Sequence, residues 1–377
     1  MKAIKNGKLV LQDSIIEGKI LIYDDFISDI VDRVENISDF DWIDARGCYV
    51  APGFIDIHVH GAYGLNTMDE DREAIGMLSY RLCENGVTAF LPTTITEETA
   101  KIYRALEGIR HFMNNTNGAR VLGAHLEGPF INSEKKGAQN DKYILKPDFS
   151  VFENYMDVLR LVTMAPELDE DFEYIRRVSR EHRTVVSMGH TNATYDQAMA
   201  AIEAGAKSAT HVFNAMSGLG HRSPGVAGAV LDSDIYCELI ADKIHVHPAL
   251  FRILSAIKGD KLILITDSIS AACVKHGDYV LGGLKVTVDS DSARLEDGTL
   301  AGSILRMNAA VRNIIESTGL PLPQVIRMVS LNPAELLGEA NKLGSIQVGK
   351  CADITIFDEA IDIKATIVSG KVIYSEI

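Results

Sequence analysis

A strand-then-helix rhythm repeats through the middle of the chain and constrains the fold more than any other feature of the sequence. Amphipathic segments with helical spacing follow most of the apolar runs, which predicts parallel β/α units. Eight such units favour a TIM-like (β/α)₈ barrel; a doubly wound sheet is the alternative, but no G-x-G-x-x-G motif is present. The eight apolar runs are residues 54–60, 87–91, 121–127, 161–165, 184–190, 207–212, 235–241 and 262–267.

The two ends of the chain differ from this middle. Both alternate short apolar runs with turns marked by glycine, and neither shows a helical period. A long, polar, non-periodic segment, residues 128–148, follows the third predicted strand. On a barrel, this position lies over the mouth of the active site.

Composition excludes several classes of function. The chain has 37 Lys and Arg against 52 Asp and Glu, a net charge of −15, which argues against a nucleic-acid partner. No apolar run approaches the ~18 residues of a membrane span, and the N-terminus has no apolar signal-peptide core. The five cysteines include no C-x-x-C pair, which fits a reducing compartment. We therefore expect a cytoplasmic protein with no nucleic-acid or membrane partner.

Two histidines, His58 and His60, interrupt the first apolar run. Alternate residues of a strand share a face, so Asp56, His58 and His60 are expected to point into the barrel. The Cα atoms of the two histidines would then lie about 7 Å apart, which lets both rings reach one metal ion. One buried and one surface histidine without a ligand role is the alternative.

Four other apolar runs carry a polar side chain at or next to their last residue, namely Glu127, His190, His211 and Asp267. Barrel enzymes place catalytic groups at the C-terminal ends of their strands. A buried carboxylate such as Asp267 is costly without a partner. Helix capping or packing could explain each residue singly. Three His or Glu ligands with one open position are typical of a catalytic divalent metal site, which is the function we predict.

One further motif can be dismissed. Residues 344–351, GSIQVGKC, resemble a P-loop. However, Cys351 replaces the Ser or Thr that would hold magnesium, and no helical pattern follows. A nucleotide site is therefore not expected there.

Motifs along nearly the whole chain resemble the amidohydrolase superfamily and, within it, the deacetylases of N-acetylglucosamine-6-phosphate. HLEGPF followed by THVFNAM is specific to these deacetylases. The resemblance implies a barrel over residues 51–339 and a small β-sandwich built from residues 1–50 and 340–377. The matching motifs include APGFIDIHVHGA, GVTAFLPT, GAHLEGPFI, KKGAQN, MGHTNA, ATHVFNAMS, HRSPGVAGA, LIADKIHVHP, ITDSI and GTLAGS.

The activity implied by the resemblance is metal-dependent hydrolysis of the N-acetyl amide, giving glucosamine-6-phosphate and acetate in amino-sugar catabolism. A phosphorylated N-acetyl amino sugar is the expected partner, and a homodimer the expected assembly. N-acetylgalactosamine-6-phosphate is a rival substrate. A cyclic-amide hydrolase is another alternative, but residues 161–170 lack the lysine that such enzymes carboxylate. A non-catalytic phosphosugar-binding homologue is the alternative outside the enzymes.

The resemblance also implies roles for single residues. Glu127, His190 and His211 match the ligands of one divalent ion, most often Zn²⁺, with Fe²⁺ or Mn²⁺ as alternatives. His58 and His60 match a pair that holds a second ion in some members, so one or two ions per subunit are expected. Asp267 matches the catalytic carboxylate, which acts as general base and then as general acid. The positions that match substrate-binding residues are Ala138, Gln139, Asn214, Ala215, Arg222, His245, Leu305, Arg306 and Met307.

Within that substrate set, Arg222 and His245 match phosphate contacts, Arg222 from a neighbouring subunit, and residues 305–307 match a segment that closes on the substrate. Two positions depart from the family pattern. Gln139 stands where a histidine is usual; it can donate a hydrogen bond to the acetyl carbonyl but cannot carry a charge. Lys243 stands where glycine is common. The reaction type is expected to hold, whereas turnover and sugar preference depend on these positions.

Overall fold

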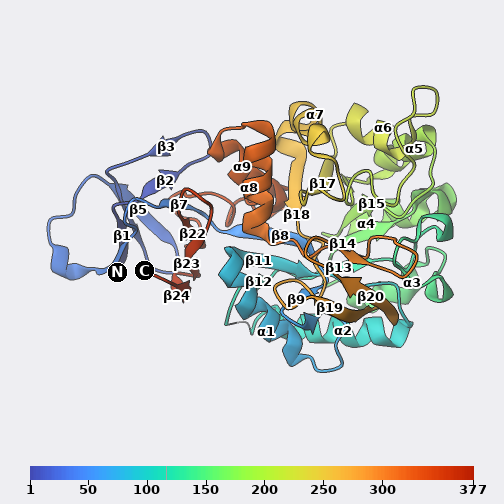
Figure 1. Ribbon diagram of the computed structural model, residues 1–377, viewed down its shortest axis with the longest axis horizontal. Helices are drawn as coiled ribbons and strands as arrows, with labels where there is room; N and C mark the ends of the chain where they lie inside the picture. The colour runs from blue at the N-terminus through green and yellow to red at the C-terminus, as the bar shows by residue number, and fades with distance from the viewer. Residues whose placement is uncertain (116) are drawn as a thin grey trace.

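Two sheets of parallel strands form the centre of the larger part of the molecule (Figure 1), in a computed structural model that describes residues 1–115 and 117–377. Their strands are β8 (Phe54–Val59), β11 (Val87–Pro92), β12 (Arg120–Val121), β13 (Ala124–Glu127), β14 (Leu159–Met164), β15 (Val185–Met188), β16 (Ser208–Ala209), β17 (Tyr236–Ile240) and β18 (Leu262–Ile265). One sheet runs in the order β13 to β18, and the other has the order β12–β11–β8. Single parallel bridges join the two sheets at Val59–Ser268 and Thr93–His125. The predicted arrangement of parallel β/α units is therefore present.

Each predicted apolar run contains a strand, but several runs are longer than their strands, and two differ for reasons that the structure shows. Residues 121–127 divide into β12 and β13 because Gly123 has a φ of 137°. A Cβ at this position would lie 2.6 Å from the carbonyl oxygen of Val158, so only glycine fits. The run 207–212 holds only the two residues of β16. His211 consequently lies in the turn after that strand rather than within it.

Helices connect the strands and cover the outside of the sheets (Figure 1). Their ends carry the expected signals: Thr194 and Gln197 form a capping box at the start of α5, and Gly86 has a φ of 83° where the segment after α1 ends. The helices are α1 (Glu73–Leu82), α2 (Thr99–Phe112), α3 (Phe149–Phe152), α4 (Glu173–Glu181), α5 (Tyr195–Ala204), α6 (Gly225–Asp232), α7 (Pro248–Lys258), α8 (Met307–Thr318), α9 (Leu322–Met328) and α10 (Leu331–Leu336).

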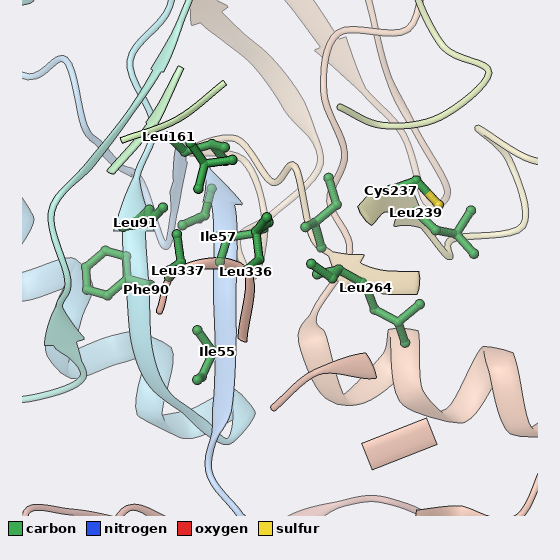
Figure 2. Close-up of a cluster of buried hydrophobic side chains, with 14 of the residues drawn as sticks. Ile55, Ile57, Phe90, Leu91, Leu161, Cys237, Leu239, Leu264, Leu336 and Leu337 are labelled. Atoms are coloured by element: carbon green, nitrogen blue, oxygen red, sulfur yellow. The ribbon is translucent and has the colours of Figure 1, made fainter. Parts of the chain in front are cut away.

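The main apolar core lies between the strands and these helices. Figure 2 shows Ile55 and Ile57 of β8 beside Leu336 and Leu337 at the end of α10. Both isoleucines are buried, as predicted for the face of this strand that alternates with the histidines. The apolar face of β8 thereby stabilises the strand, while its polar face is left for the site.

The two chain ends assemble into two further sheets, and both termini lie in this part of the molecule (Figure 1). Their strands are β1 (Lys2–Lys5), β2 (Lys8–Val10), β3 (Ile15–Ile16), β4 (Ile20–Tyr23), β5 (Ile27–Val31), β6 (Asp41–Asp44), β7 (Tyr49–Pro52), β22 (Ile354–Phe357), β23 (Ile363–Val368) and β24 (Lys371–Ser375). One sheet has the order β5–β4–β1–β6 and the other β24–β23–β22–β7–β2–β3. Strand β7 pairs with β2 and with β22, so it joins the two ends of the chain. Side chains of both sheets share one buried apolar cluster.

A three-stranded antiparallel sheet was not predicted. It consists of β19 (Gly277–Leu281), β20 (Leu284–Val288) and β21 (Ala293–Arg294), and a smaller pair of strands, β9 (Gly61–Ala62) and β10 (Leu65–Asn66), follows β8. Apolar side chains of the three-stranded sheet pack on Ile95 and Ile269, in the segments after β11 and β18. The sheet therefore covers the ends of the parallel strands where the candidate site lies. No helix among the described residues combines the length and apolar character that a membrane span requires.

Candidate metal and active site

The polar residues predicted at the strand ends come together at one place. His58 lies on β8, Glu127 ends β13, and His190, His211 and Asp267 follow β15, β16 and β18. All five are buried, and His58 has no exposed surface. Because the carboxyl ends of parallel strands meet at one edge, residues up to 209 positions apart converge.

Glu127, His190 and His211 form a triangle of donor atoms. The Glu127 Oε1 atom lies 3.2 Å from both His190 Nε2 and His211 Nε2, and these two nitrogens are 3.2 Å apart. An ion bound tetrahedrally at about 2.0–2.1 Å would separate its donors by about 3.3–3.4 Å. The three side chains therefore fit a small divalent ion as they stand.

Hydrogen bonds hold the two imidazole rings of this triangle in place. His190 Nδ1 donates to the carbonyl oxygen of Lys135 at 2.8 Å, and His211 Nδ1 donates to that of Asn214 at 3.2 Å. A proton on Nδ1 leaves the Nε2 lone pair free for a metal. The local loops thus select the ligand tautomer of both histidines.

His58, His60 and Asp267 form a second group of donors beside the first. Asp267 Oδ1 lies 3.3 Å from His58 Nε2 and 3.3 Å from His60 Nε2. Glu127 lies between the two groups, with Oε1 3.3 Å from His58 Nε2 and Oε2 3.3 Å from His60 Nε2. His58 Nε2 forms no hydrogen bond although it is buried, and a cation would satisfy it. This donor set also fits a divalent ion.

The charges of the site keep its carboxylates ionised. Burial by itself would raise the pKa of Glu127, but His58 and His190 hold that pKa well below its usual range. Burial would likewise raise the pKa of Asp267, and His58 and His60 outweigh it, so the pKa is lowered. For His60 the opposite holds: burial lowers the pKa, while Asp267 and Glu127 raise it to about 9. An ionised carboxylate is the form that binds a cation or accepts a proton.

Three residues of the site have strained backbones. His190, His211 and Asp267 have φ values of 48°, 30° and 49°, in the left-handed region that residues other than glycine rarely adopt. Such conformations cost about 1–3 kcal/mol each and persist where the surrounding structure imposes them. At each of these strand ends, the strain accompanies a side chain aimed at the donor cluster.

Gln139 is fixed against the metal-ligand cluster. Its Oε1 accepts a hydrogen bond from the Thr96 backbone N–H at 2.6 Å, and its Nε2 donates to Glu127 Oε2 at 2.5 Å. The Thr96 N–H can bond only to the amide oxygen, so the amide orientation is settled. One hydrogen on Nε2 remains, and Gln139 lines the cavity described next.

A cavity of about 390 Å³ opens beside the donor cluster, within the range of small-molecule sites. His60, Glu127, His190, His211 and Asp267 line its inner end. Predicted substrate-binding residues that also line it are Ala138, Gln139, Asn214, Ala215 and His245.

The other predicted substrate positions lie outside this cavity. Arg222 is exposed and is not part of its lining. Leu305 and Arg306 line a neighbouring cavity with Asp242, and Met307 is buried as the first residue of α8. Lys243 has a φ of 70°, a conformation that favours glycine, which explains why glycine is common at this position. Its Nζ pairs with Glu316 at 2.8 Å, and Lys243 does not line the cavity.

Several site residues were missed from the sequence. Lys135 and Arg294 line the cavity, and Arg294 belongs to the unpredicted sheet, whose alternating residues around Gly282 and Gly283 were a readable hairpin signal. Glu238 is completely buried against His58. The sequence feature that could have indicated a role for Glu238 is its place as a single charged residue inside the apolar run 235–241.

The chain matches a known family of hydrolytic enzymes. The pattern of the amidohydrolase family matches residues 49–373. The chain belongs to this family and is a hydrolytic enzyme. The barrel type of the fold agrees with solved structures of the same superfamily.

Within the amidohydrolase family, the chain is similar to deacetylases of N-acetylhexosamine phosphates. The chain is 42% identical over 333 residues to N-acetylglucosamine-6-phosphate deacetylase of Bacillus subtilis (strain 168), which covers 86% of this chain and 84% of the relative. It is 36% identical to N-acetylgalactosamine-6-phosphate deacetylase of Escherichia coli O157:H7, covering 85% and 87%. The crystal structure of N-acetylglucosamine-6-phosphate deacetylase from Pasteurella multocida has a TM-score of 0.93 at 34% identity and covers 98% of this chain and 99% of that one.

Proposed function

We propose that this chain is a metal-dependent deacetylase of N-acetylglucosamine-6-phosphate, which releases acetate and glucosamine-6-phosphate. The observation that carries the proposal is the triangle of Glu127, His190 and His211 at the inner end of the cavity, with Asp267 beside it. Relatives with this activity match most of the chain. The predicted general type of reaction, hydrolysis, is confirmed by the family.

In this proposal Glu127, His190 and His211 hold a divalent ion, with Zn²⁺ favoured and Fe²⁺ or Mn²⁺ as alternatives. His58, His60 and Asp267 are the candidates for a second ion, which Glu127 can share. A divalent ion here supplies Lewis-acid chemistry, which makes water a stronger nucleophile at neutral pH and polarises a carbonyl.

Asp267 moves the proton. Its carboxylate is ionised and lines the cavity, so it can accept a proton from the attacking water as the new C–O bond forms. It then delivers that proton to the sugar nitrogen as the C–N bond breaks, and acetate and an amine leave. The remaining Nε2 hydrogen of Gln139 is available to stabilise the developing negative charge on the carbonyl oxygen.

Basic residues of the cavity favour binding of a phosphorylated sugar by an acidic chain. His245, Lys135 and Arg294 line the cavity, and the guanidinium group of Arg294 is well suited to phosphate oxygens. Arg222 lies outside the cavity of its own chain, so contact with the phosphate would require a second copy of the protein. The homodimer expected from the family would supply that copy.

N-acetylgalactosamine-6-phosphate is the second candidate substrate. The relative from Escherichia coli O157:H7 named for that sugar matches 85% of the chain. The two sugars differ at one hydroxyl group, and residues of the segments 134–139 and 294–302, which line the cavity, are candidates to distinguish it.

We also infer the finer architecture. The parallel sheets, joined by bridges at two edges, form one (β/α)₈ barrel over residues 51–339. The sheets of residues 1–50 and 340–377 share an apolar cluster, which supports a β-sandwich. The cytoplasmic location stays a prediction.

Acetate release from a panel of N-acetyl hexosamines, each with and without the 6-phosphate, tests the proposal. Activity is expected on the 6-phosphates, with N-acetylglucosamine-6-phosphate preferred. Preference for the galactosamine epimer would select the second candidate, and no acetate from any sugar would contradict both.

A further inference from the structure

Glu238 is a buried carboxylate of the site region for which the reaction above has no use. It lies in the middle of β17, has no exposed surface, and is surrounded by apolar neighbours along its strand. A buried negative charge is costly unless hydrogen bonds and an opposite charge compensate it. Its partners therefore indicate why this position holds a glutamate.

One oxygen of Glu238 contacts both ligand groups. Oε2 lies 3.0 Å from His58 Nδ1 and accepts a weaker hydrogen bond from the His211 backbone N–H at 3.3 Å. Oε2 is the acceptor for the His211 N–H and lies 3.0 Å from the His58 ring nitrogen, which assigns the proton of this contact to His58 Nδ1. The lone pair of Nε2 then faces Glu127 and Asp267, each 3.3 Å away.

Another buried histidine, His125, does not orient His58 by hydrogen bonding. Its Nε2 is 2.7 Å from Thr163 Oγ1 and its Nδ1 is 3.4 Å from Thr93 Oγ1, so both nitrogens have hydroxyl partners. Its ring instead packs edge-on against the His58 ring, with centroids 4.5 Å apart. His125 restricts the position of the His58 ring, and Glu238 determines which nitrogen carries the proton.

We propose that Glu238 is a positioning residue that holds His58 as the Nδ1–H tautomer and thereby makes His58, His60 and Asp267 a functional metal site. A carboxylate behind a ligating histidine commonly has this effect, and its loss costs about 10–100-fold in metal affinity. The inference rests on the proposed metal-dependent function, but it concerns binding and protonation, which can be measured without substrate.

Zn²⁺ binding by chelator competition tests the proposal in the full-length enzyme. Wild-type protein is expected to bind two equivalents. Glu238→Leu, which keeps the volume and removes both oxygens, should weaken one equivalent by about 10–100-fold and leave the other unchanged. Glu238→Gln can still accept a hydrogen bond from His58 Nδ1, so its affinity for that equivalent of Zn²⁺ should lie between those of the wild type and Glu238→Leu. Asp353→Asn, a buried carboxylate paired with Arg120 in another part of the molecule, is the matched control and should keep both affinities.

Nitrogen-15 NMR of the zinc-loaded wild-type enzyme, with His58 assigned by substitution, is a second measurement that needs no folded Glu238 variant. It should show the His58 proton on Nδ1. A proton on Nε2, a wild-type enzyme that binds only one equivalent, or unchanged affinities in a folded Glu238→Leu protein would each overturn the inference. If two equivalents bind as described but no hexosamine phosphate releases acetate, the proposed function fails and this inference stands.

Discussion

At the scale of single residues, the site depends on side chains whose backbones are held in an unfavourable, left-handed conformation. The left-handed φ values of His190, His211 and Asp267 all occur just after a strand ends. Fixed rings and ionised carboxylates are then ready before any substrate arrives. Such preorganisation is what allows electrostatic groups to stabilise a transition state at little further cost.

Replacing Asp267 with Asn should reduce turnover by more than about 100-fold, because the shape is kept and the proton acceptor is lost. Steady-state acetate release at saturating substrate measures this effect. Turnover near that of the wild type would remove Asp267 from the role of general base.

Gln139→Leu should weaken Zn²⁺ binding by about 10–100-fold, since it removes the hydrogen bond that orients Glu127. Chelator competition measures the change. Gln197→Leu is the matched control, because Gln197 only caps α5, so this variant should lose some thermal stability and keep its metal affinity. Equal metal affinities in the two variants would show that Gln139 does not orient the ligand.

The principal side chains could be predicted because each is a polar residue within or near the end of an apolar run, a pattern that depends only on neighbours in sequence. Glu238 could not be assigned to the site because its partners, His58 and His211, are distant in sequence. Arg294 could not be assigned because the sheet that carries it was not predicted. Arg222 lies outside the cavity of its own chain, so its expected contact with the phosphate stays a prediction.

At the scale of elements, the close packing of strands around β15 sets the position of His190. A Cβ on Gly189 would lie 2.7 Å from the side chains of both Thr163 on β14 and Thr210 after β16. Only a residue without a side chain lets these segments approach so closely.

Gly189→Ala should therefore destabilise the protein by about 1–3 kcal/mol, as expected for an overpacked core. Chemical denaturation measures the free energy of unfolding. Gly218→Ala is the control, since a Cβ there meets no atom within 4 Å and should be tolerated. A Gly189→Ala protein as stable as the control would contradict the packing argument.

Element types were predictable wherever periodicity was long, as in the segments that became α1 and α2. The sheet β19–β20–β21 was overlooked because it is an insertion that breaks the β/α rhythm, although its alternation is regular. The length of β16 could not be predicted, because neighbouring strands rather than local sequence determine where its pairing ends.

At the scale of the whole molecule, residues far apart in the chain fasten the terminal sheets to the segment that carries the parallel strands. Arg120 of β12 pairs with Asp353, next to β22, at 2.7 Å, and the Ser369 backbone N–H donates to the same carboxylate at 2.7 Å. The hydroxyl groups of Thr355 and Thr366 donate to carbonyl oxygens of residues 86 and 83. The β-rich ends could be predicted from the sequence, whereas this ion pair and these hydrogen bonds could not.

Asp353→Asn should lower the free energy of unfolding by about 1.5–3 kcal/mol, because it leaves Arg120 without its charge partner. Thermal and chemical denaturation check this value. Glu359→Gln removes a carboxylate from an exposed pair with Lys8 and should change stability by less than about 1 kcal/mol. Similar effects of the two substitutions would mean that the buried pair does not fasten the terminal sheets.

In the proposed function, Glu127, His190 and His211 would hold a divalent ion, and hydrolysis would depend on that ion. The most direct test of this dependence is to strip the enzyme with a chelator, return Zn²⁺ in measured steps, and follow acetate release from N-acetylglucosamine-6-phosphate against bound metal. We expect the stripped enzyme to be inactive and its activity to return in proportion to bound zinc, with none restored in a His211→Ala variant. Full activity in the metal-free enzyme would contradict the account.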